Sequence, residues 1–209
     1  EGFNQALLRG FKGAFGDGVT VMFPGQTSLQ AGGERAGKRI RLKLADGEAV
    51  GQLPLIKAWS PEFWQDVPVS WGTKQAGYLV RAAAPAYAIM RTQPVAVGRF
   101  FDAEDVRLQR RVAFVGSEVA RKLFGNNSAV GESIRIKGLS FEVIGVLADK
   151  VQMSSYYSPD KYCVFVPYTV VGQLFYQDFV DNLVVEIIDT SRTEQALVNA
   201  QQDSVANRR

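Results

Sequence analysis

The chain has 209 residues, of which 46% are hydrophobic and 22% are charged, and its formal net charge is +3. This length and balance support one or two buried cores and exclude the disordered and collagen-like classes. So small a charge excludes a nucleic-acid footprint unless the positive residues cluster. The chain contains no histidine and one cysteine, which excludes an internal disulfide and any Ser-His-Asp or Cys-His catalytic relay.

The beginning of the sequence bears on a membrane connection. No stretch approaches the roughly 20 apolar residues that span a bilayer, and no basic-then-apolar signal peptide is present. Apolar residues nevertheless recur at helical spacing beside Arg9 and Lys12, at Phe3, Leu7, Leu8, Phe11 and Phe15. This segment is either the aqueous continuation of a membrane helix or a docked terminal helix.

Regular structure is expected to begin with a strand over 19–23, followed by a loop over the Gly/Ala/Gln-rich segment 25–37. Five positive residues lie in or beside this loop: Arg35, Lys38, Arg39, Arg41 and Lys43. Because no aromatic residues are interleaved with them, the simpler interpretation is a solvated loop. The alternative is a bound headgroup or an acidic partner, which makes Arg35, Lys38 and Arg39 candidate partner contacts.

A weak helix and three strands are expected next. The helix is predicted to begin near Asp46 and to end before Pro54, although Gly47 and Gly51 each disfavour it by roughly 1 kcal/mol relative to alanine. The strands are predicted over 55–60, 68–71 and 78–83. With the strand over 19–23, these elements include a β-α-β-β arrangement.

The middle of the chain predicts a strand followed by a helix. Residues 112–115 form a short apolar run, Ser117 is expected to cap the helix after it, and Gly125 is expected to end that helix. A Gly-Ser junction can also belong to a nucleophile elbow, but the sequence G-x-S-x-G is absent and no histidine base exists. Capping is therefore the predicted role of Ser117.

A hairpin is predicted after this helix. Lys137-Gly138 lies between the segments 132–136 and 139–147, and glycine suits the positive φ of a tight turn. Because the second segment is apolar on both faces, it is expected in the interior of a sheet.

An acidic turn precedes the 112–115 strand. Asp102, Glu104 and Asp105 are expected to stabilise the start of a short helix, and to pair with the arginines that follow, Arg107, Arg110 and Arg111. The same acids could instead bind a hard cation or act as a glycosidase-like acid and base. No G-x-x-x-x-G-K-[ST] phosphate loop is present, which excludes ATP hydrolysis by this chain.

Aromatic residues are the other candidate surface. Tyr156, Tyr157 and Tyr162 in SSYYSPDKY are candidate partner contacts, together with the aromatic residues Trp59, Phe63, Trp64 and Trp71. Core packing is the simpler interpretation for the tryptophans, and a partly exposed loop for the tyrosines. Cys163 lies in an apolar run and is expected to be a small buried hydrophobe rather than a reactive thiol.

The end of the chain predicts a helical turn over 170–175, a central strand over 183–188, and a final helix that starts with the capping pair Ser191 and Glu194. A strand plus helix near each end, flanking a middle unit, predicts an α+β fold in which the two ends form one split lobe. The middle unit would be an insertion in that lobe.

The segment 98–147 resembles a known pattern: G-R-x-F, an acidic turn, V-x-V-[IL]-G-x-x-x-A-x-x-L-F, and V-G-x-x-[IL]-x-[IL]-x-G-x-x-[FY]-x-V-I-G-V. The matching residues are Gly98, Arg99, Phe101, Val112, Val115, Gly116, Ala120, Leu123, Phe124, Val130, Gly131, Ile134, Ile136, Gly138, Phe141, Val143, Ile144, Gly145 and Val146. This pattern is similar to that of the extracytoplasmic core domain of MacB-like ABC transporter permeases. Weaker likenesses at 16–18, 24–27 and 166–168 extend the resemblance over nearly the whole chain.

The resemblance implies a subdomain arrangement. Residues 1–15 would be a stalk continuing from a membrane helix, and residues 16–83 with 180–209 would form a split Porter-like β-α-β lobe. Residues 84–179 would form an inserted, mixed Sabre-like subdomain.

The resemblance also implies a non-enzymatic domain on the periplasmic side of the bacterial inner membrane. The full permease would have four membrane helices, with this domain between the first and second, and would form a homodimer. ATP would bind a separate cytoplasmic ATPase domain or subunit, and this chain would hold no cofactor. Movement of the helices would be transmitted to this domain, which would push substrate or act on a periplasmic adaptor.

Two alternative functions stay open. Related permeases use the corresponding domain to bind a lipoprotein carrier or to activate cell-wall hydrolases. A carboxylate enzyme or a small-molecule receptor would instead require a deep acidic pocket around Asp102 and Asp105.

Overall fold

The chain divides into two units in the computed structural model, which describes residues 18–25, 41–54, 56–149 and 156–188. One unit comprises Glu1–Pro61 and Asp178–Arg209, and the other comprises Glu62–Gln177. Both contain strands and helices, so the α+β class is confirmed. Among the described residues, none of the helices is long and apolar enough to cross a membrane.

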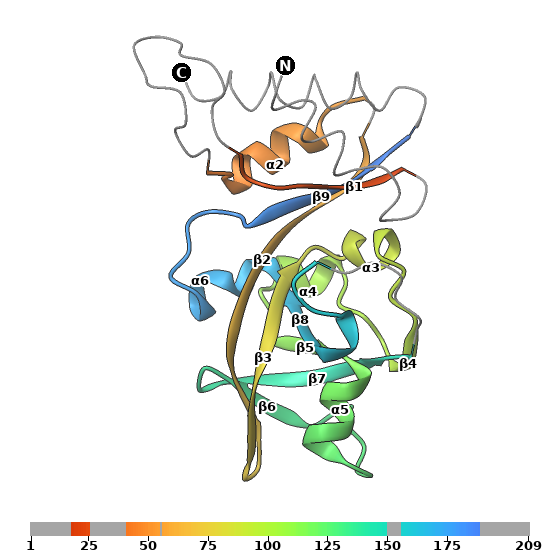
Figure 1. Ribbon diagram of the computed structural model, residues 1–209, viewed down its shortest axis with the longest axis vertical. Coiled ribbons are helices and arrows are strands. Elements are labelled where there is room, and N and C mark those ends of the chain that lie inside the picture. Colours follow the sequence, from red (N-terminus) through yellow and green to blue (C-terminus); the bar gives the residue numbers. More distant parts are fainter. Residues whose placement is uncertain (1–17, 26–40, 55, 150–155, 189–209) are drawn as a thin grey trace. The chain divides into compact units, whose positions relative to one another are not determined.

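In its described residues, the discontinuous unit contains strands β1 and β9, the start of β2, and helix α2 (Figure 1). Strand β1 (Val19–Met22) pairs antiparallel with β9 (Asn182–Ile187), and β9 neighbours β2 (Ile56–Trp71), which begins in this unit. Helix α2 (Leu44–Gly51) starts where the Asp46 carboxylate accepts a hydrogen bond of 2.8 Å from the Lys43 amide. The expected strands at both ends of the chain and the weak helix are therefore confirmed.

The two glycines that disfavour α2 have a packing role. A Cβ on Gly51 would lie 2.2 Å from Nε1 of Trp59, and a Cβ on Gly47 would lie 2.6 Å from Cζ3 of the same indole. The helix backbone lies directly on the Trp59 ring, and only glycine leaves room for it.

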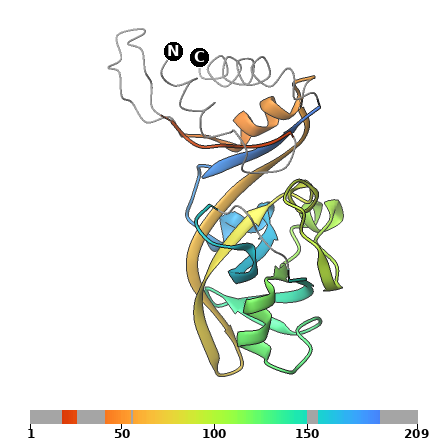
Figure 2. The same ribbon diagram turned by 45° about the vertical axis from the view of Figure 1, so that its right-hand side comes forward.

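The continuous unit is built on a long hairpin whose closed end reaches past β7 in both views (Figures 1 and 2). Strand β2 pairs with β3 (Lys74–Ala83), β3 runs parallel to β8 (Cys163–Pro167), and β8 is antiparallel to β5 (Val112–Val115). Strand β7 (Leu139–Leu147) pairs with β5 and β4 (Val95–Gly98), and β6 (Ser133–Ile136) pairs with β7 and β2. The interior position predicted for β7 is confirmed.

Short helices connect these strands. They are α3 (Ala86–Met90), α4 (Ala103–Arg107), α5 (Ser117–Phe124), the 3₁₀ turns η1 (Asp160–Tyr162) and η2 (Tyr168–Val170), and α6 (Val171–Leu174). The core between the strands and helices is aromatic, with the Phe114 ring centroid 4.9 Å from that of Phe100 and 6.2 Å from that of Phe165. The turn predicted at Lys137-Gly138 is confirmed by φ angles of 49° and 84°.

Two local predictions are wrong. The separate strands predicted over 55–60 and 68–71 are one strand, because residues 62–67 pair with β3 although Gln65 and Asp66 are polar and exposed. Ser117 does not cap α5: Gly116 is the N-cap, and the Ser117 hydroxyl makes no cap hydrogen bond. A Cβ on Gly116 would lie 2.3 Å from the Lys161 carbonyl oxygen, so this junction is closed by backbone contact instead.

The two units divide the chain elsewhere than the expected subdomains. The expected boundaries lie after residues 83 and 179, whereas the units divide after Pro61 and Gln177. The difference arises because β3 pairs with β8 and thereby joins residues 74–83 to the middle of the chain. The Porter-like and Sabre-like assignment stays a prediction. The segments 1–15 and 25–37 lie mostly or wholly outside the described residues, as do Arg35, Lys38, Arg39 and the final helix.

Candidate functional site

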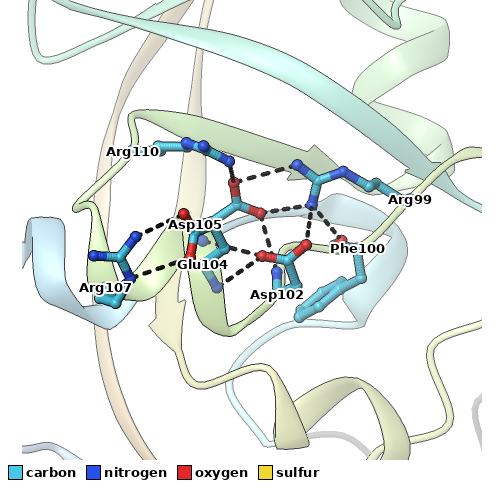
Figure 3. Close-up of polar contacts among 7 residues, drawn as sticks. All are labelled: Arg99, Phe100, Asp102, Glu104, Asp105, Arg107 and Arg110. Atoms are coloured by element: carbon cyan, nitrogen blue, oxygen red, sulfur yellow. Dashed lines mark hydrogen bonds and ion pairs between the residues drawn. The ribbon is translucent and has the colours of Figure 1, made fainter.

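The acidic turn forms the start of α4 (Figure 3). Oδ1 of Asp102 accepts hydrogen bonds from the amides of Glu104 and Asp105, at 2.9 and 3.0 Å. Oδ2 of Asp105 in turn accepts a bond of 3.0 Å from the Asp102 amide. This reciprocal pair is a capping box, which confirms the predicted helix-starting role of these acids.

Asp105 is fully buried and is held by two arginines that approach its carboxylate from different sides (Figure 3). Arg99 donates two hydrogen bonds, of 2.6 and 3.2 Å, and Arg110 donates one of 3.2 Å. Burial by itself raises the pKa of Asp105, but the hydrogen bonds from Arg99 and the other donors outweigh burial and lower the pKa to about 2.

These contacts decide between the interpretations of the turn. Asp105 is ionised at neutral pH, and its two oxygens already accept bonds from guanidinium and amide groups. A general acid needs a raised pKa and access to its substrate, and Asp105 has neither. The predicted pairing of the arginines is confirmed for Arg107 with Glu104 and for Arg110 with Asp105. Arg111 instead donates to Gln173 at 2.7 Å.

A second buried network holds the tyrosine segment, and we call it the Glu62 clamp, made of Glu62, Arg81 and Tyr156. The side chains of Glu62 and Arg81 are 0% and 1% exposed, and their closest oxygen and nitrogen atoms are 2.5 Å apart. The Tyr156 hydroxyl donates to the other Glu62 oxygen at 2.5 Å. A carboxylate on β2 and a guanidinium on β3 therefore fix a residue that lies about 75 positions later in the chain than Arg81.

The clamp also fixes the backbone of the tyrosine segment. Nη2 of Arg81 donates to the carbonyl oxygens of Tyr156 and Ser158, at 2.7 and 3.1 Å. The guanidinium carbons of Arg81 and Arg91 lie 4.8 and 5.3 Å from the centroid of the Tyr156 ring. Burial is the main cause that raises the pKa of Tyr156 well above its ordinary value, and the Glu62 carboxylate adds to it. Tyr156 is thus an anchor and stays protonated.

The other two predicted tyrosines lie outside the clamp. Tyr157 is 61% exposed, has a φ of 67°, and stacks on Trp64 with ring centroids 3.9 Å apart. Tyr162 is half-buried, and the ammonium nitrogens of Lys161 and Lys122 lie 5.0 and 5.5 Å from its ring centroid. The role of Tyr157 and Tyr162 as partner contacts stays a prediction.

The remaining aromatic and sulfur side chains have packing roles. Phe63 is buried, and Trp71 contacts the Phe124 ring and donates to Glu132 at 2.8 Å. Cys163 is fully buried, and burial raises the pKa of its thiol. This confirms the predicted buried hydrophobe.

Sequence reasoning missed the residues that hold both networks. Arg99 is the main partner of Asp105 but was expected only as part of a family motif. Glu62 and Arg81 were not singled out. Glu62 lies between two predicted strands, but Arg81 is a charge inside the apolar strand predicted over 78–83. Such a charge in a buried strand needs a partner, and this was the available signal.

Comparisons with known proteins give a consistent result. The family model described as the MacB-like periplasmic core domain matches residues 1–202. The macrolide export ATP-binding/permease protein MacB of Bdellovibrio bacteriovorus is 32% identical over 179 residues, which are 85% of this chain and 27% of that protein. The MacB protein of Burkholderia cenocepacia is 32% identical over 191 residues, with 90% and 27% covered. The chain thus spans about a quarter of the length of these relatives.

Solved structures show the same fold at low identity. The periplasmic region of MacB from Actinobacillus actinomycetemcomitans has a TM-score of 0.74 at 19% identity, with 90% of this chain and 83% of that chain covered. The extracellular domain of the noncanonical ABC-type transporter YknZ from Gram-positive bacteria has a TM-score of 0.71 at 17% identity, with 85% and 88% covered.

Proposed function

Because the chain belongs to the MacB-like periplasmic core domain family, we propose that it is the extracytoplasmic domain of an ABC transporter permease and that it transmits movement rather than catalysing a reaction. The family match over residues 1–202 carries this proposal. The relatives named above are ATP-binding/permease proteins, so the ATPase would be a separate domain or subunit.

The proposed mechanism requires elements that move as rigid bodies, because a soft domain would absorb displacement instead of passing it on. Two observations in the Glu62–Gln177 unit support such rigidity. Asp105 and Glu62 are each buried and each hydrogen-bonded to arginine. Breaking either network would leave a buried carboxylate without its arginine, which is unfavourable in free energy. Local opening of this unit is therefore suppressed.

The finer parts of the proposal concern the whole protein. We propose that the domain lies between the first two of four membrane helices, that the permease is a homodimer of the inner membrane, and that ATP-driven helix movement reaches a periplasmic adaptor through this domain. Residues 1–15 would connect it to the first membrane helix. The Porter-like and Sabre-like lobes would be the two bodies that move.

Membrane context is tested with the full-length gene product, expressed with its own flanking sequences. We expect it in the membrane fraction after carbonate extraction, and we expect protease added to spheroplasts to cleave this domain. Recovery in the soluble fraction, or protection from external protease, would refute the proposed location.

Transmission is tested in the reconstituted full-length transporter. Replacing the clamp pair together, as Glu62→Met with Arg81→Leu, removes the anchoring of Tyr156 without leaving a buried lone charge. We expect ATP hydrolysis to continue and export to fall by about tenfold. A fall of this size corresponds to the loss of a typical coupling free energy between two sites. The matched control replaces the exposed pair, as Glu104→Gln with Arg107→Met, and should keep both activities.

Hydrogen exchange on the same protein gives an independent check. Amides of the segment 98–147 should exchange more slowly than the average of the domain, because this segment carries the buried Asp105 network and the interior strand β7. Finding it the fastest-opening part of the domain would contradict the transmission mechanism, whatever the location of the protein.

A further inference from the structure

Two lysines from different elements converge on one aromatic ring. Lys122 belongs to α5 and Lys161 to η1, and their ammonium nitrogens lie 5.5 and 5.0 Å from the centroid of the Tyr162 ring. These distances are within the range of cation–π attraction. We call Lys122, Lys161 and Tyr162 the lysine–tyrosine patch.

The backbone beneath the patch is fixed. The Gly116 amide, just before α5, donates to the Cys163 carbonyl oxygen at 2.8 Å, and a Cβ on Gly116 would lie 2.3 Å from the Lys161 carbonyl oxygen. The start of α5 and η1 are therefore in direct backbone contact. Asp160, next to Lys161, is buried and accepts a hydrogen bond of 2.8 Å from Gln93. The patch is thus preorganised, which lowers the entropic cost of binding.

Among the described residues, the charges of the patch lack a carboxylate partner, unlike those of several arginines in the same unit. Arg99, Arg107 and Arg110 each lie within 4 Å of a carboxylate. Glu118, the acid on the same helix as Lys122, is paired with Arg121. Within the described ranges, neither Lys122 nor Lys161 forms an ion pair with a carboxylate. Two positive charges thus lie at one tyrosine ring without a carboxylate partner among the residues that the structure describes.

We propose that the lysine–tyrosine patch binds a carboxylate-bearing segment of a partner polypeptide. The inference deepens the proposed function, and it rests on that function only for placing the partner outside the cytoplasm. A lysine ammonium group is a compact positive charge that donates hydrogen bonds to a carboxylate. Tyrosine is enriched at protein interfaces, where its ring packs on aliphatic side-chain carbons. Glutamate or aspartate beside an apolar residue fits both features.

The composition of the patch favours a polypeptide over a membrane or a phosphate. Membrane-surface binding uses clusters of about 4–8 basic residues, and the patch has two. Phosphate recognition favours the planar fork of arginine or a nest of backbone amides, and the patch offers lysines, while the Gly116 amide is already bonded to Cys163. The acidic segment is therefore the occupant to which the geometry points.

The binding test uses a fluorescein-labelled decapeptide of alternating glutamate and alanine and the full-length protein in detergent, read by fluorescence anisotropy at low salt. We expect Lys122→Gln with Lys161→Gln to weaken binding about tenfold, since each charge at an interface contributes roughly a kcal/mol or less. The matched control, Lys74→Gln with Lys137→Gln, makes the same change in net charge at two exposed lysines outside the patch and should weaken binding less than twofold.

Further outcomes decide the proposal. Retained binding in Lys122→Arg with Lys161→Arg, and weaker binding in Tyr162→Leu, would support it. Equal loss in both glutamine double variants would overturn it, because only net charge would then matter. Displacement of the peptide by millimolar inorganic phosphate, or capture of the protein by anionic vesicles that the patch variant abolishes, would also overturn it. None of these results depends on whether the protein exports a substrate.

Discussion

The Asp105 network and the Glu62 clamp solve the same problem over very different spans of sequence. Each holds a fully buried carboxylate with arginine, but the Asp105 partners lie within six residues of it, whereas the clamp joins residues 62, 81 and 156. The arginines of the Asp105 network are about half exposed, at 46% and 45%, and Arg81 is 1% exposed. The first network therefore shapes a turn, and the second holds separate parts of the unit in place.

The sharpest way to break this comparison is Arg81→Met. The substitution leaves the Glu62 carboxylate buried without its guanidinium partner, and it frees the carbonyl groups of Tyr156 and Ser158. We expect a loss of about 3–5 kcal/mol in the free energy of unfolding, measured by urea denaturation.

The double variant Glu62→Met with Arg81→Met serves as its control and should recover much of the loss, because no lone charge remains. A single variant as stable as the wild type would show that water reaches the pair.

Acid titration measures how much the ionised Asp105 carboxylate contributes to the stability of the fold. Because the folded pKa of Asp105 is lowered to about 2 from 3.8, its stabilisation is fully present above about pH 4 and is lost as pH falls through 2. We therefore expect the ion-paired carboxylate to contribute about 2 kcal/mol to stability at neutral pH, at roughly 1.4 kcal/mol for each pKa unit by which it is lowered.

Unfolding measured between pH 5 and 2 should show this decline in the wild type and a smaller decline in Asp105→Asn. If stability falls with pH equally in both proteins, protonation of Asp105 does not cause the loss of stability in acid.

A smaller effect is expected from Tyr156→Phe, which removes one hydroxyl from the clamp and keeps the ring. The Glu62 oxygen loses a donor at 2.5 Å, and we expect a loss of about 1–2 kcal/mol in urea denaturation. Tyr157→Phe is the matched control on the neighbouring exposed ring and should change stability by less than about 0.5 kcal/mol. If the two substitutions have equal effects, the clamp does not depend on the Tyr156 hydroxyl.

The smallest effect is expected at the exposed pair of α4. Glu104→Gln should cost less than about 1 kcal/mol, since side chains exposed by 49% and 66% gain little from pairing. Raising the salt concentration should remove the difference from the wild type. A large loss of stability that salt does not change would mean that Glu104 contributes as the buried Asp105 and Glu62 do.

The contrast also explains what the sequence predicts well. The capping box of Asp102 and Asp105 lies within four residues, and so do the turn at Lys137-Gly138 and the end of α5 at Gly125; local geometry alone decides them. The resemblance over 98–147 agrees with the family match over 1–202.

What failed depends on contacts distant in sequence. Serine is a preferred N-cap residue, but Gly116 is the N-cap of α5 instead of Ser117. The backbone of Lys161 packs so closely against Gly116 that no side chain fits there. The joining of 55–60 and 68–71 into β2 depends on the pairing of the intervening residues with β3. The candidate surface was predicted in part: Tyr157 is exposed, whereas Tyr156 is an anchor because Glu62 and Arg81 lie beneath it.

The contact of α2 with Trp59 sets a limit on how this domain can vary. Gly47 and Gly51 are the poorest helix formers in α2, and they are the residues that the indole leaves no room to replace. A saturation scan should therefore find a helix that tolerates almost any residue at the exposed Glu48 and rejects even alanine at both glycines. The requirement thus links two glycines four positions apart in the helix to a tryptophan eight residues after the second, so the three positions can change only together.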